Sequence, residues 1–287
     1  MKKTGVRLAG AAGFDLVRKT FYSPIPDLRE IDPKVWDARS STGGVEFDSL
    51  TQIEHLERNL APFVSELRPE NFPAVGPVFS AANRQFGPVD ASLLYAMLRY
   101  AKPKRVLEFG AGFSTLVSSA ACSANDEEGF PVEFISSDPY PPGFLSASIK
   151  GLTDLRKRKL TDVSVDDFLE LDVNDVLFVD TTHTVKLGGD VNYVILEALP
   201  QLRAGVLVHF HDIFLPWEYP RVWFERDANY WAEQYLLQAF LCFNREYEIV
   251  LAAHFLAREY PERFARAIPS FTPEVRPGSF WLRRRSD

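Results

Sequence analysis

The chain has few cysteines and lacks long hydrophobic runs. Among its 287 residues only Cys122 and Cys242 are cysteines, and both lie in apolar helical patterns far apart in sequence. This usage excludes a disulfide framework and suits a reducing compartment, so we expect a cytoplasmic protein. No stretch approaches the roughly 20 apolar residues that cross a bilayer, and Arg7 interrupts the short apolar run at 6–14. We therefore expect neither a membrane partner nor a secretion signal.

Positive charge is also in deficit. Lys and Arg total 32 against 39 Asp and Glu, which gives a net charge of 32 − 39 = −7. Nucleic-acid binding usually needs a clustered basic face, so this balance argues against nucleic acid as a partner. Hydrophobic residues (46%) and charged residues (25%) are at the globular average, which excludes a disordered chain. A small molecule is the partner class that we expect, and the sequence leaves the homo-oligomeric state open.

The length fits one large domain, or one domain with a cap. Residues 1–85 hold many helix breakers around one amphipathic pattern at 50–67. This pattern predicts a helix that starts at a Ser49-x-x-Gln52 capping box and bends at Pro62. A short amphipathic helix cannot bury its apolar stripe alone. We therefore expect 1–85 to form an N-terminal cap or lid on a domain of residues 86–287, in a position to cover an active site.

Strand and helix patterns alternate regularly from Asp90, a predicted helix N-cap, to the end of the chain. Short apolar runs separated by helices are typical of parallel strands buried on both faces, and therefore of a doubly wound α/β sheet. Two final strand patterns predict an antiparallel pair, which makes the sheet seven-stranded rather than six-stranded as in a dinucleotide-binding fold. The predicted strands are 105–109, 132–136, 159–163, 175–179, 206–210, 247–253 and 279–284, and the predicted helices among them are 114–124, 144–151, 189–201 and 228–243.

The strongest motif joins a buried strand to a helix through a glycine-containing turn. The strand ends at Glu108-Phe109, and Gly110-Ala111-Gly112 leads into a helix that begins near Ser114. The glycines let the backbone turn sharply and approach a ligand, while free N–H groups at the helix N-terminus favour an anionic group. The motif therefore predicts a loop that binds a nucleotide-containing ligand.

Two ligands compete for this loop: a dinucleotide pyrophosphate and the amino-acid end of S-adenosylmethionine. Dinucleotide sites need a third glycine or an alanine where this chain has Thr115. A carboxylate is smaller and suits the polar Ser114-Thr115 edge, and Glu108 is placed to meet an ammonium group. Asp138, at the end of the next strand, suits two ribose hydroxyls, although an Asp before Pro139 is as typical of a turn cap.

On these residues the sequence resembles the class I, Rossmann-like S-adenosylmethionine-dependent methyltransferases from about residue 90 to residue 284. Glu108, Gly110 and Gly112 match the first motif of that family, and Asp138 matches its ribose-binding acid. The segment 278–282 matches its last strand. The segment 21–27 and the sequence His211-Asp212-Ile213-Phe214 resemble a bacterial subgroup of largely uncharacterised methyltransferases. The resemblance implies that S-adenosylmethionine is the cofactor.

A second constellation follows the fourth and fifth predicted strands. Asp180 and His183 follow the fourth strand, and His211 and Asp212 follow the fifth. Ligands of open α/β sheets lie just beyond the carboxyl ends of the strands, so these side chains can converge beside the methyl donor. Two carboxylates with one or two imidazoles can bind a divalent cation.

This constellation resembles the metal-dependent O-methyltransferases that act on sugars and catechols. The resemblance implies that Asp180, His211 and Asp212 are metal ligands and that His183 is the general base. His211 departs from the pattern, because those enzymes have Asp or Glu at its position. Imidazole is a poor ligand for magnesium and a good one for manganese or iron, so either the metal differs or His211 is itself the base in a metal-free site. The bland alternative is that Asp180 caps a loop and the histidines bond to nearby backbone.

The sequence therefore predicts a methyltransferase that acts on a small molecule, more often at oxygen than at nitrogen. One alternative is an enzyme of this fold that uses the same cofactor for ring closure or aminocarboxypropyl transfer. An NAD-dependent oxidoreductase is a further alternative that Thr115 disfavours, and a non-catalytic binding protein is another. Sugar, aromatic and amino-acid-derived acceptors all remain open.

Overall fold

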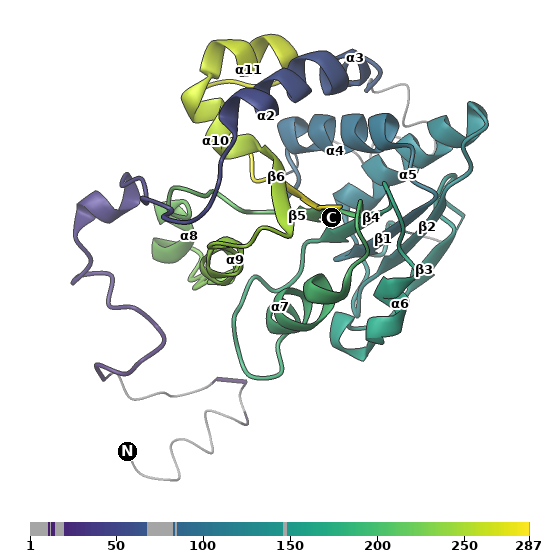
Figure 1. The fold of residues 1–287 in the computed structure, drawn as a ribbon. Helices are drawn as coiled ribbons and strands as arrows, with labels where there is room; N and C mark the ends of the chain where they lie inside the picture. The colour runs from purple at the N-terminus through teal and green to yellow at the C-terminus, as the bar shows by residue number, and fades with distance from the viewer. Residues whose placement is uncertain are drawn as a thin grey trace.

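A computed structural model of the chain describes residues 11, 13–14, 20–67, 83, 85–145 and 148–286. Its centre is a seven-stranded sheet with the order β3-β2-β1-β4-β5-β7-β6 (Figure 1). The strands are β1 (Arg105–Phe109), β2 (Glu133–Ser137), β3 (Asp154–Arg156), β4 (Val176–Val179), β5 (Leu207–Phe210), β6 (Tyr247–Ala252) and β7 (Phe280–Arg284).

The direction of the strands confirms the predicted fold class. Strands β1 to β5 pair in parallel, whereas β7 pairs antiparallel with both β5 and β6. Every residue of β4 and β5 is buried, because helices cover both faces of the sheet. The sheet is therefore doubly wound, mostly parallel and closed by an antiparallel last strand.

One face of the sheet carries α4 (Pro88–Ala101) and α5 (Phe113–Glu127), with a second layer of helices beyond them (Figure 1). In that layer α2 (Ser49–His55) continues through a π-helical turn at Leu56–Leu60 into α3 (Ala61–Val64). The wide turn directly precedes Pro62, whose missing N–H breaks the regular bonding of the helix. Next to these helices lie α10 (Ala253–Glu259) and α11 (Pro261–Ala267).

The opposite face carries α6 (Val165–Leu169), α7 (Asp190–Tyr193) and α9 (Glu233–Leu241). A π-helical turn (Val194–Ala198) and a 3-10 turn (Leu199–Gln201) extend α7, so the predicted helix at 189–201 is confirmed. The predicted helix at 228–243 is shorter than expected and begins at Glu233. Outside this layer, α8 (Arg221–Glu225) and a 3-10 turn (Pro33–Trp36) bring Trp36 to 5.2 Å from Phe224, measured between ring centroids.

The third strand was predicted at the wrong place. It lies at Asp154–Arg156, and the expected region instead forms a 3-10 turn at Leu160–Asp162. Because β3 is an edge strand and half exposed, it needs no continuous apolar run, while Leu160 and Val163 are buried by packing of the turn. The predicted helix at 144–151 is also wrong, since its described residues form turns and bends; residues 146 and 147 lie outside the described residues.

The N-terminal helix differs from the prediction in its N-cap residue. Asp48 is the N-cap and accepts a hydrogen bond from the Thr51 N–H at 3.1 Å, so the predicted Ser49 capping box is wrong. Ile53 and Leu60 are fully buried in the same core as the sheet. This helix packs on α4, α11 and β6. It is therefore part of the layered core, while residues 68–82 of the expected cap lie outside the described residues.

Asp90 does not cap its helix. The helix begins two residues earlier, after Gly87, and Asp90 points inward from its first turn. Its Oδ1 accepts hydrogen bonds from the Gly278 N–H (3.0 Å), the Ser279 N–H (2.8 Å) and the Ser279 hydroxyl (2.8 Å). Asp90 thus joins α4 to the residues that lead into β7. Among the described residues, none of the helices is long and apolar enough to cross a membrane.

Candidate active site

Gly110 brings the first strand against the loop that follows β4. Its φ is +98°, and a Cβ built on it would lie 1.7 Å from the Asp180 carbonyl oxygen. The Gly110 N–H donates to the Ser137 carbonyl at 3.0 Å, and the Asp180 N–H donates to the Phe109 carbonyl at 2.9 Å. Only glycine fits this position. Gly110 therefore sets how closely the glycine loop approaches Asp180 and the residues that follow β4.

Glu108 is buried beneath the start of α5. Its carboxylate accepts hydrogen bonds from the hydroxyls of Ser114 (2.8 Å), Thr115 (2.6 Å) and Ser136 (2.5 Å). Burial raises the pKa of Glu108 to about 7, although these three donors favour the charged form. In this structure Glu108 orders the loop, and Thr115, the residue that disfavoured a dinucleotide, belongs to the same network.

Gly112 is the N-cap of α5 and faces open space. A Cβ at this position would meet nothing within 4 Å, in contrast to Gly110. The Gly112 N–H donates to the Thr115 hydroxyl at 2.9 Å, so the polar Thr115 side chain closes the first turn of the helix. The start of a 15-residue helix beside an open backbone suits an anionic group of a ligand.

Asp138 lies at the end of β2 and faces the glycine loop. Its Oδ2 accepts the Ala111 N–H at 3.2 Å, and its Oδ1 accepts the Tyr140 N–H at 2.6 Å. The second contact is the turn cap that competed with the ribose-binding interpretation. The carboxylate is half-buried and so retains an exposed side. A ribose-binding role for Asp138 stays a prediction.

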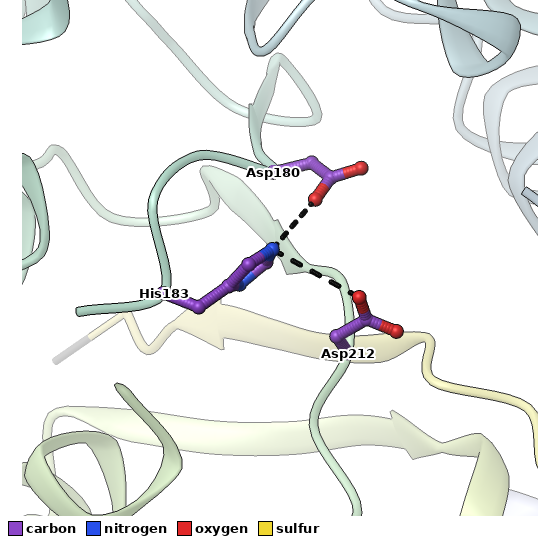
Figure 2. A group of neighbouring side chains, drawn as sticks. All are labelled: Asp180, His183 and Asp212. Atoms are coloured by element: carbon purple, nitrogen blue, oxygen red, sulfur yellow. Dashed lines mark ion pairs between the residues drawn. The ribbon is translucent and has the colours of Figure 1, made fainter. Parts of the chain in front are cut away.

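Asp180, His183 and Asp212 converge at the ends of β4 and β5, as the sequence predicted (Figure 2). His183 Nε2 lies 3.1 Å from Asp180 Oδ1 and 3.9 Å from Asp212 Oδ2. One donor atom from each residue lies within 4.8 Å of the others, which is a spacing that suits a metal ion. The two carboxylates are partly exposed and the imidazole is buried. We call these three residues the acid–histidine cluster.

Carboxylates on both sides of His183 control its charge. Burial alone would lower its pKa, but the hydrogen bonds to Asp180 and Glu233 raise the pKa of His183 to about 10. Burial raises the pKa of Asp180, and the neighbouring His211 and His183 overcome this effect and hold it below its ordinary value. Burial raises the pKa of Asp212 to about 6. With only these groups present, His183 is protonated at neutral pH.

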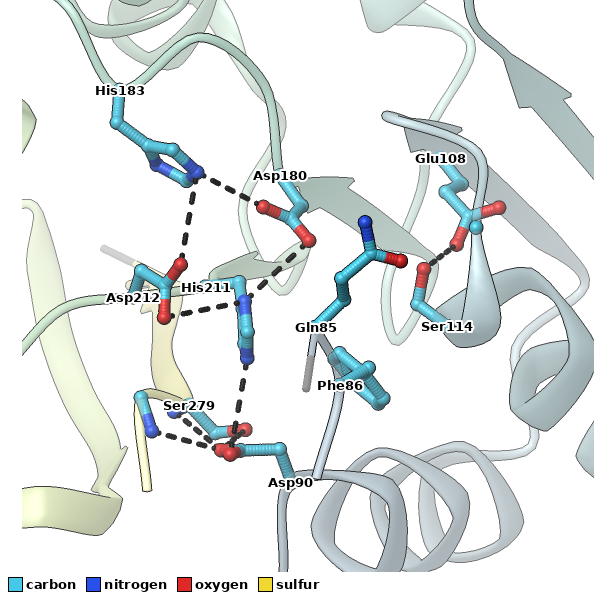
Figure 3. A network of polar contacts seen from close by, with 12 residues as sticks. Gln85, Phe86, Asp90, Glu108, Ser114, Asp180, His183, His211, Asp212 and Ser279 are labelled. Carbon is cyan, nitrogen blue, oxygen red and sulfur yellow. Dashed lines mark hydrogen bonds and ion pairs between the residues drawn. The ribbon is translucent and has the colours of Figure 1, made fainter. Parts of the chain in front are cut away.

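His211 lies under the two aspartates (Figure 3). Its Nδ1 is 3.5 Å from Asp180 Oδ2 and 3.6 Å from Asp212 Oδ1, and its Nε2 is 3.8 Å from Asp90 Oδ2. These separations are long for hydrogen bonds, so both ring nitrogens are buried without a close partner in the part of the chain that the structure describes. His211 is 3% exposed. The geometry therefore favours His183 over His211 as the third metal donor, and the predicted role of His211 as a ligand or base stays a prediction.

Sequence reasoning missed four residues at this site. Glu233 contacts His183, Asp90 faces His211, the Phe86 ring lies 4.8 Å from the His211 ring, and Gln85 points toward the same region in Figure 3. All four lie far in sequence from the motifs that they reach. An acid at the start of a predicted helix was the available signal for Asp90, and the sequence predicted it only as a helix cap. No such signal marked Glu233, because the predicted helix began at residue 228.

Three other histidines are structural, as the sequence predicted for two of them. Burial lowers the pKa of His55 to about 4 and that of His254 to about 3. His209, predicted to lie beneath the site, is fully buried between Phe178 and Trp281, and burial lowers its pKa to about 3. These imidazoles are neutral at physiological pH.

Comparisons with known proteins match the part of the chain that carries this site. Residues 107–213 match a family model described as a methyltransferase domain. This span contains every residue that the sequence assigned to the cofactor, the metal or the base. An uncharacterized protein of Archaeoglobus fulgidus is 27% identical over 156 residues, which are 51% of this chain and 67% of that protein.

Solved methyltransferases overlap with the chain loosely. A Podospora anserina methyltransferase bound to S-adenosylhomocysteine aligns over 85% of this chain and 91% of its own, with 15% identity and a TM-score of 0.41. The plantazolicin methyltransferase BpumL in complex with S-adenosylhomocysteine aligns over 84% and 100%, with 13% identity and a TM-score of 0.35.

The domain match and the sheet with its antiparallel last strand agree with a methyltransferase fold. The alternatives that use the fold for another reaction are not favoured by these findings.

Proposed function

We propose that the protein transfers the methyl group of S-adenosylmethionine to a hydroxyl oxygen of a small molecule, with a divalent cation at the acid–histidine cluster. The observation that carries this proposal is the convergence of Asp180, His183 and Asp212 next to the glycine loop. The cofactor's reactive end and an acceptor bound at the cluster would thus lie at the same edge of the sheet.

On the cofactor side, the chain's own groups would bind and orient S-adenosylmethionine. The open backbone at Gly112 and the N-terminus of α5 suit the carboxylate of its amino-acid end. Glu108 holds Ser114 and Thr115 in place for this contact. Asp138 is the proposed partner of the ribose hydroxyls.

On the acceptor side, the donor set fits a cation. Two partly exposed carboxylates and one buried imidazole offer oxygen and nitrogen donors, a mixture that suits manganese or iron better than magnesium. A bound cation would lower the pKa of the acceptor hydroxyl and orient it. The acceptor hydroxyl would lose its proton to solvent, its oxygen would attack the methyl carbon, and the carbon–sulfur bond would break to release S-adenosylhomocysteine. Without a cation, His183 is the proposed base, and it would take the acceptor's proton at Nε2 once its own proton has left, because its pKa of about 10 keeps Nε2 protonated at neutral pH.

The test is methyl transfer to a panel of catechols, sugars and amino-acid derivatives, followed by mass spectrometry of both products. We expect S-adenosylhomocysteine together with an acceptor that is one methyl group heavier. A chelator should reduce turnover at least tenfold and leave the affinity for S-adenosylhomocysteine unchanged, and added Mn²⁺ should restore turnover. Release of methylthioadenosine would contradict methyl transfer. Full activity in the chelator would contradict metal assistance and favour His183 as the base.

A further inference from the structure

Glu233 is a buried acid that the proposed reaction leaves without a role. It is the first residue of α9 and is 1% exposed. Its Oε2 lies 2.8 Å from His183 Nδ1, on the side of the ring opposite the two aspartates. A buried carboxylate is costly to keep, and here one of its oxygens, Oε1, has no hydrogen-bond partner among the described residues. A neutral side chain would fill the same space at lower cost.

Three consecutive residues hold His183: the two that precede α9 and the first residue of the helix. The Trp231 ring packs on the imidazole with 4.2 Å between ring centroids. The N–H groups of Ala232 and Glu233 donate to the His183 carbonyl at 2.9 and 3.2 Å. The Glu233 carboxylate then holds the ring by Nδ1. The backbone carbonyl, the ring face and Nδ1 of His183 are thus all held by residues 231–233.

The rest of the loop is fixed independently. The Thr182 N–H and hydroxyl donate to Asp190 of α7, at 3.1 and 2.6 Å. His183 itself has a φ of +54°, a left-handed conformation that is uncommon for a residue other than glycine. Such a backbone persists only where its surroundings hold it. The loop therefore presents His183 in one orientation, with Nε2 toward Asp180 and Asp212.

We propose that Glu233 is the positioning residue of His183: it accepts the Nδ1 proton and fixes the ring, so that when Nε2 loses its proton the lone pair faces the acid–histidine cluster. The inference rests on the proposed function, since it makes His183 useful at that cluster. A carboxylate behind an imidazole raises the basicity of the opposite nitrogen and fixes the ring, whether that nitrogen meets a metal or a proton. Glu233 acts through His183 and does not touch the acceptor.

The experiment compares Glu233→Gln with Gln234→Met. Gln234 is the next residue of α9 and equally buried, and its side chain bonds to the Phe214 N–H and the Trp217 carbonyl, away from His183. Mn²⁺ affinity is measured by electron paramagnetic resonance on the full chain. We expect Glu233→Gln to weaken Mn²⁺ binding about 10- to 100-fold and Gln234→Met to leave it within twofold of wild type. Equal Mn²⁺ affinity in wild type and Glu233→Gln would overturn the inference.

A second measurement separates this inference from the proposed function. NMR titration of the His183 ring in the metal-free protein reports the negative charge behind it. Glu233→Gln should lower the pKa of His183 by at least about one unit, and Gln234→Met should not change it. If wild type binds no Mn²⁺, metal assistance fails while the titration still decides the role of Glu233. An unchanged His183 pKa in Glu233→Gln overturns that role, and S-adenosylhomocysteine binding by both variants shows that they are folded.

Discussion

The two halves of the site lie side by side but differ in how their polar groups are satisfied. In the glycine loop, the carboxylates of Glu108 and Asp138 accept hydrogen bonds of 2.5 to 3.2 Å from hydroxyl and backbone donors. Beside the acid–histidine cluster, His211 faces the carboxylates of Asp90, Asp180 and Asp212 at 3.5 to 3.8 Å and forms no close hydrogen bond with any described residue. The carboxylates of the loop are satisfied by neutral donors, whereas the carboxylates of the cluster face the protonated imidazole of His183. A cation would complete the second half and is not needed by the first.

The largest effect on stability is expected at Gly110, where the glycine loop meets the loop that follows β4. Gly110→Ala places a Cβ 1.7 Å from the Asp180 carbonyl at a φ of +98°, so the loop or β4 must move. We expect a loss of about 3–5 kcal/mol in the free energy of unfolding, measured in urea. Gly112→Ala is the matched control, because its Cβ meets nothing within 4 Å. It should unfold like wild type but bind S-adenosylhomocysteine at least tenfold more weakly. Equal stability of the two variants would contradict the close approach.

The raised pKa of Glu108 predicts that the free energy of unfolding depends on pH through this one residue of the glycine loop. Burial raises its pKa from 4.5 to about 7 in the folded chain, so between these values the folded state holds a proton that the unfolded state has lost. Stability should therefore fall as the pH rises through this window, by up to about 1.4 kcal/mol per pH unit and about 3 kcal/mol in total. Glu108→Gln lacks this proton. The difference in unfolding free energy between variant and wild type should grow accordingly from pH 4.5 to 7, and a constant difference would refute the shift.

The smallest effect on stability is expected for His209, which lies beneath the acid–histidine cluster. His209 is fully buried, stacks on Phe178 at 4.5 Å between ring centroids, and has no hydrogen bond to a described residue at either nitrogen. Replacing a buried, unpaired polar ring with a phenyl ring removes a desolvation cost. His209→Phe should therefore leave stability unchanged or raise it by up to about 1 kcal/mol in thermal unfolding. His211→Phe removes the imidazole that faces Asp90, Asp180 and Asp212. It should lower stability by about 3 kcal/mol, because these carboxylates overcome the effect of burial, raise the pKa of His211 and keep it charged. The opposite order would mean that the cluster is not charged as described.

The sequence predicted the sheet well where a strand is buried and poorly where it is not. Strand β1 was predicted at its observed bounds because Val106, Leu107 and Phe109 are apolar and Gly110 follows directly. Strand β3 was misplaced because an edge strand of three half-exposed residues carries no such run. The antiparallel pair β6–β7 was found from two further apolar runs at the end of the chain.

For the site, local motifs were visible and their supports were not. Asp180, His183, His211 and Asp212 each follow a strand, so their meeting followed from the topology. Glu233 reaches His183 across 50 positions of the sequence. Asp90 reaches Ser279 across 189. No periodicity or spacing encodes such contacts, because they depend on how helices pack at the ends of the strands. The preference for His183 over His211 as a donor likewise came from distances alone.

The measurement that tests the account most directly is Mn²⁺ binding to wild type and Asp180→Asn in the presence of saturating S-adenosylhomocysteine. We predict about one Mn²⁺ per wild-type chain and at least a 100-fold weaker affinity in Asp180→Asn, with the affinity for S-adenosylhomocysteine the same in both. Equal Mn²⁺ binding by both proteins, or none by wild type, would contradict a cation site beside the cofactor loop.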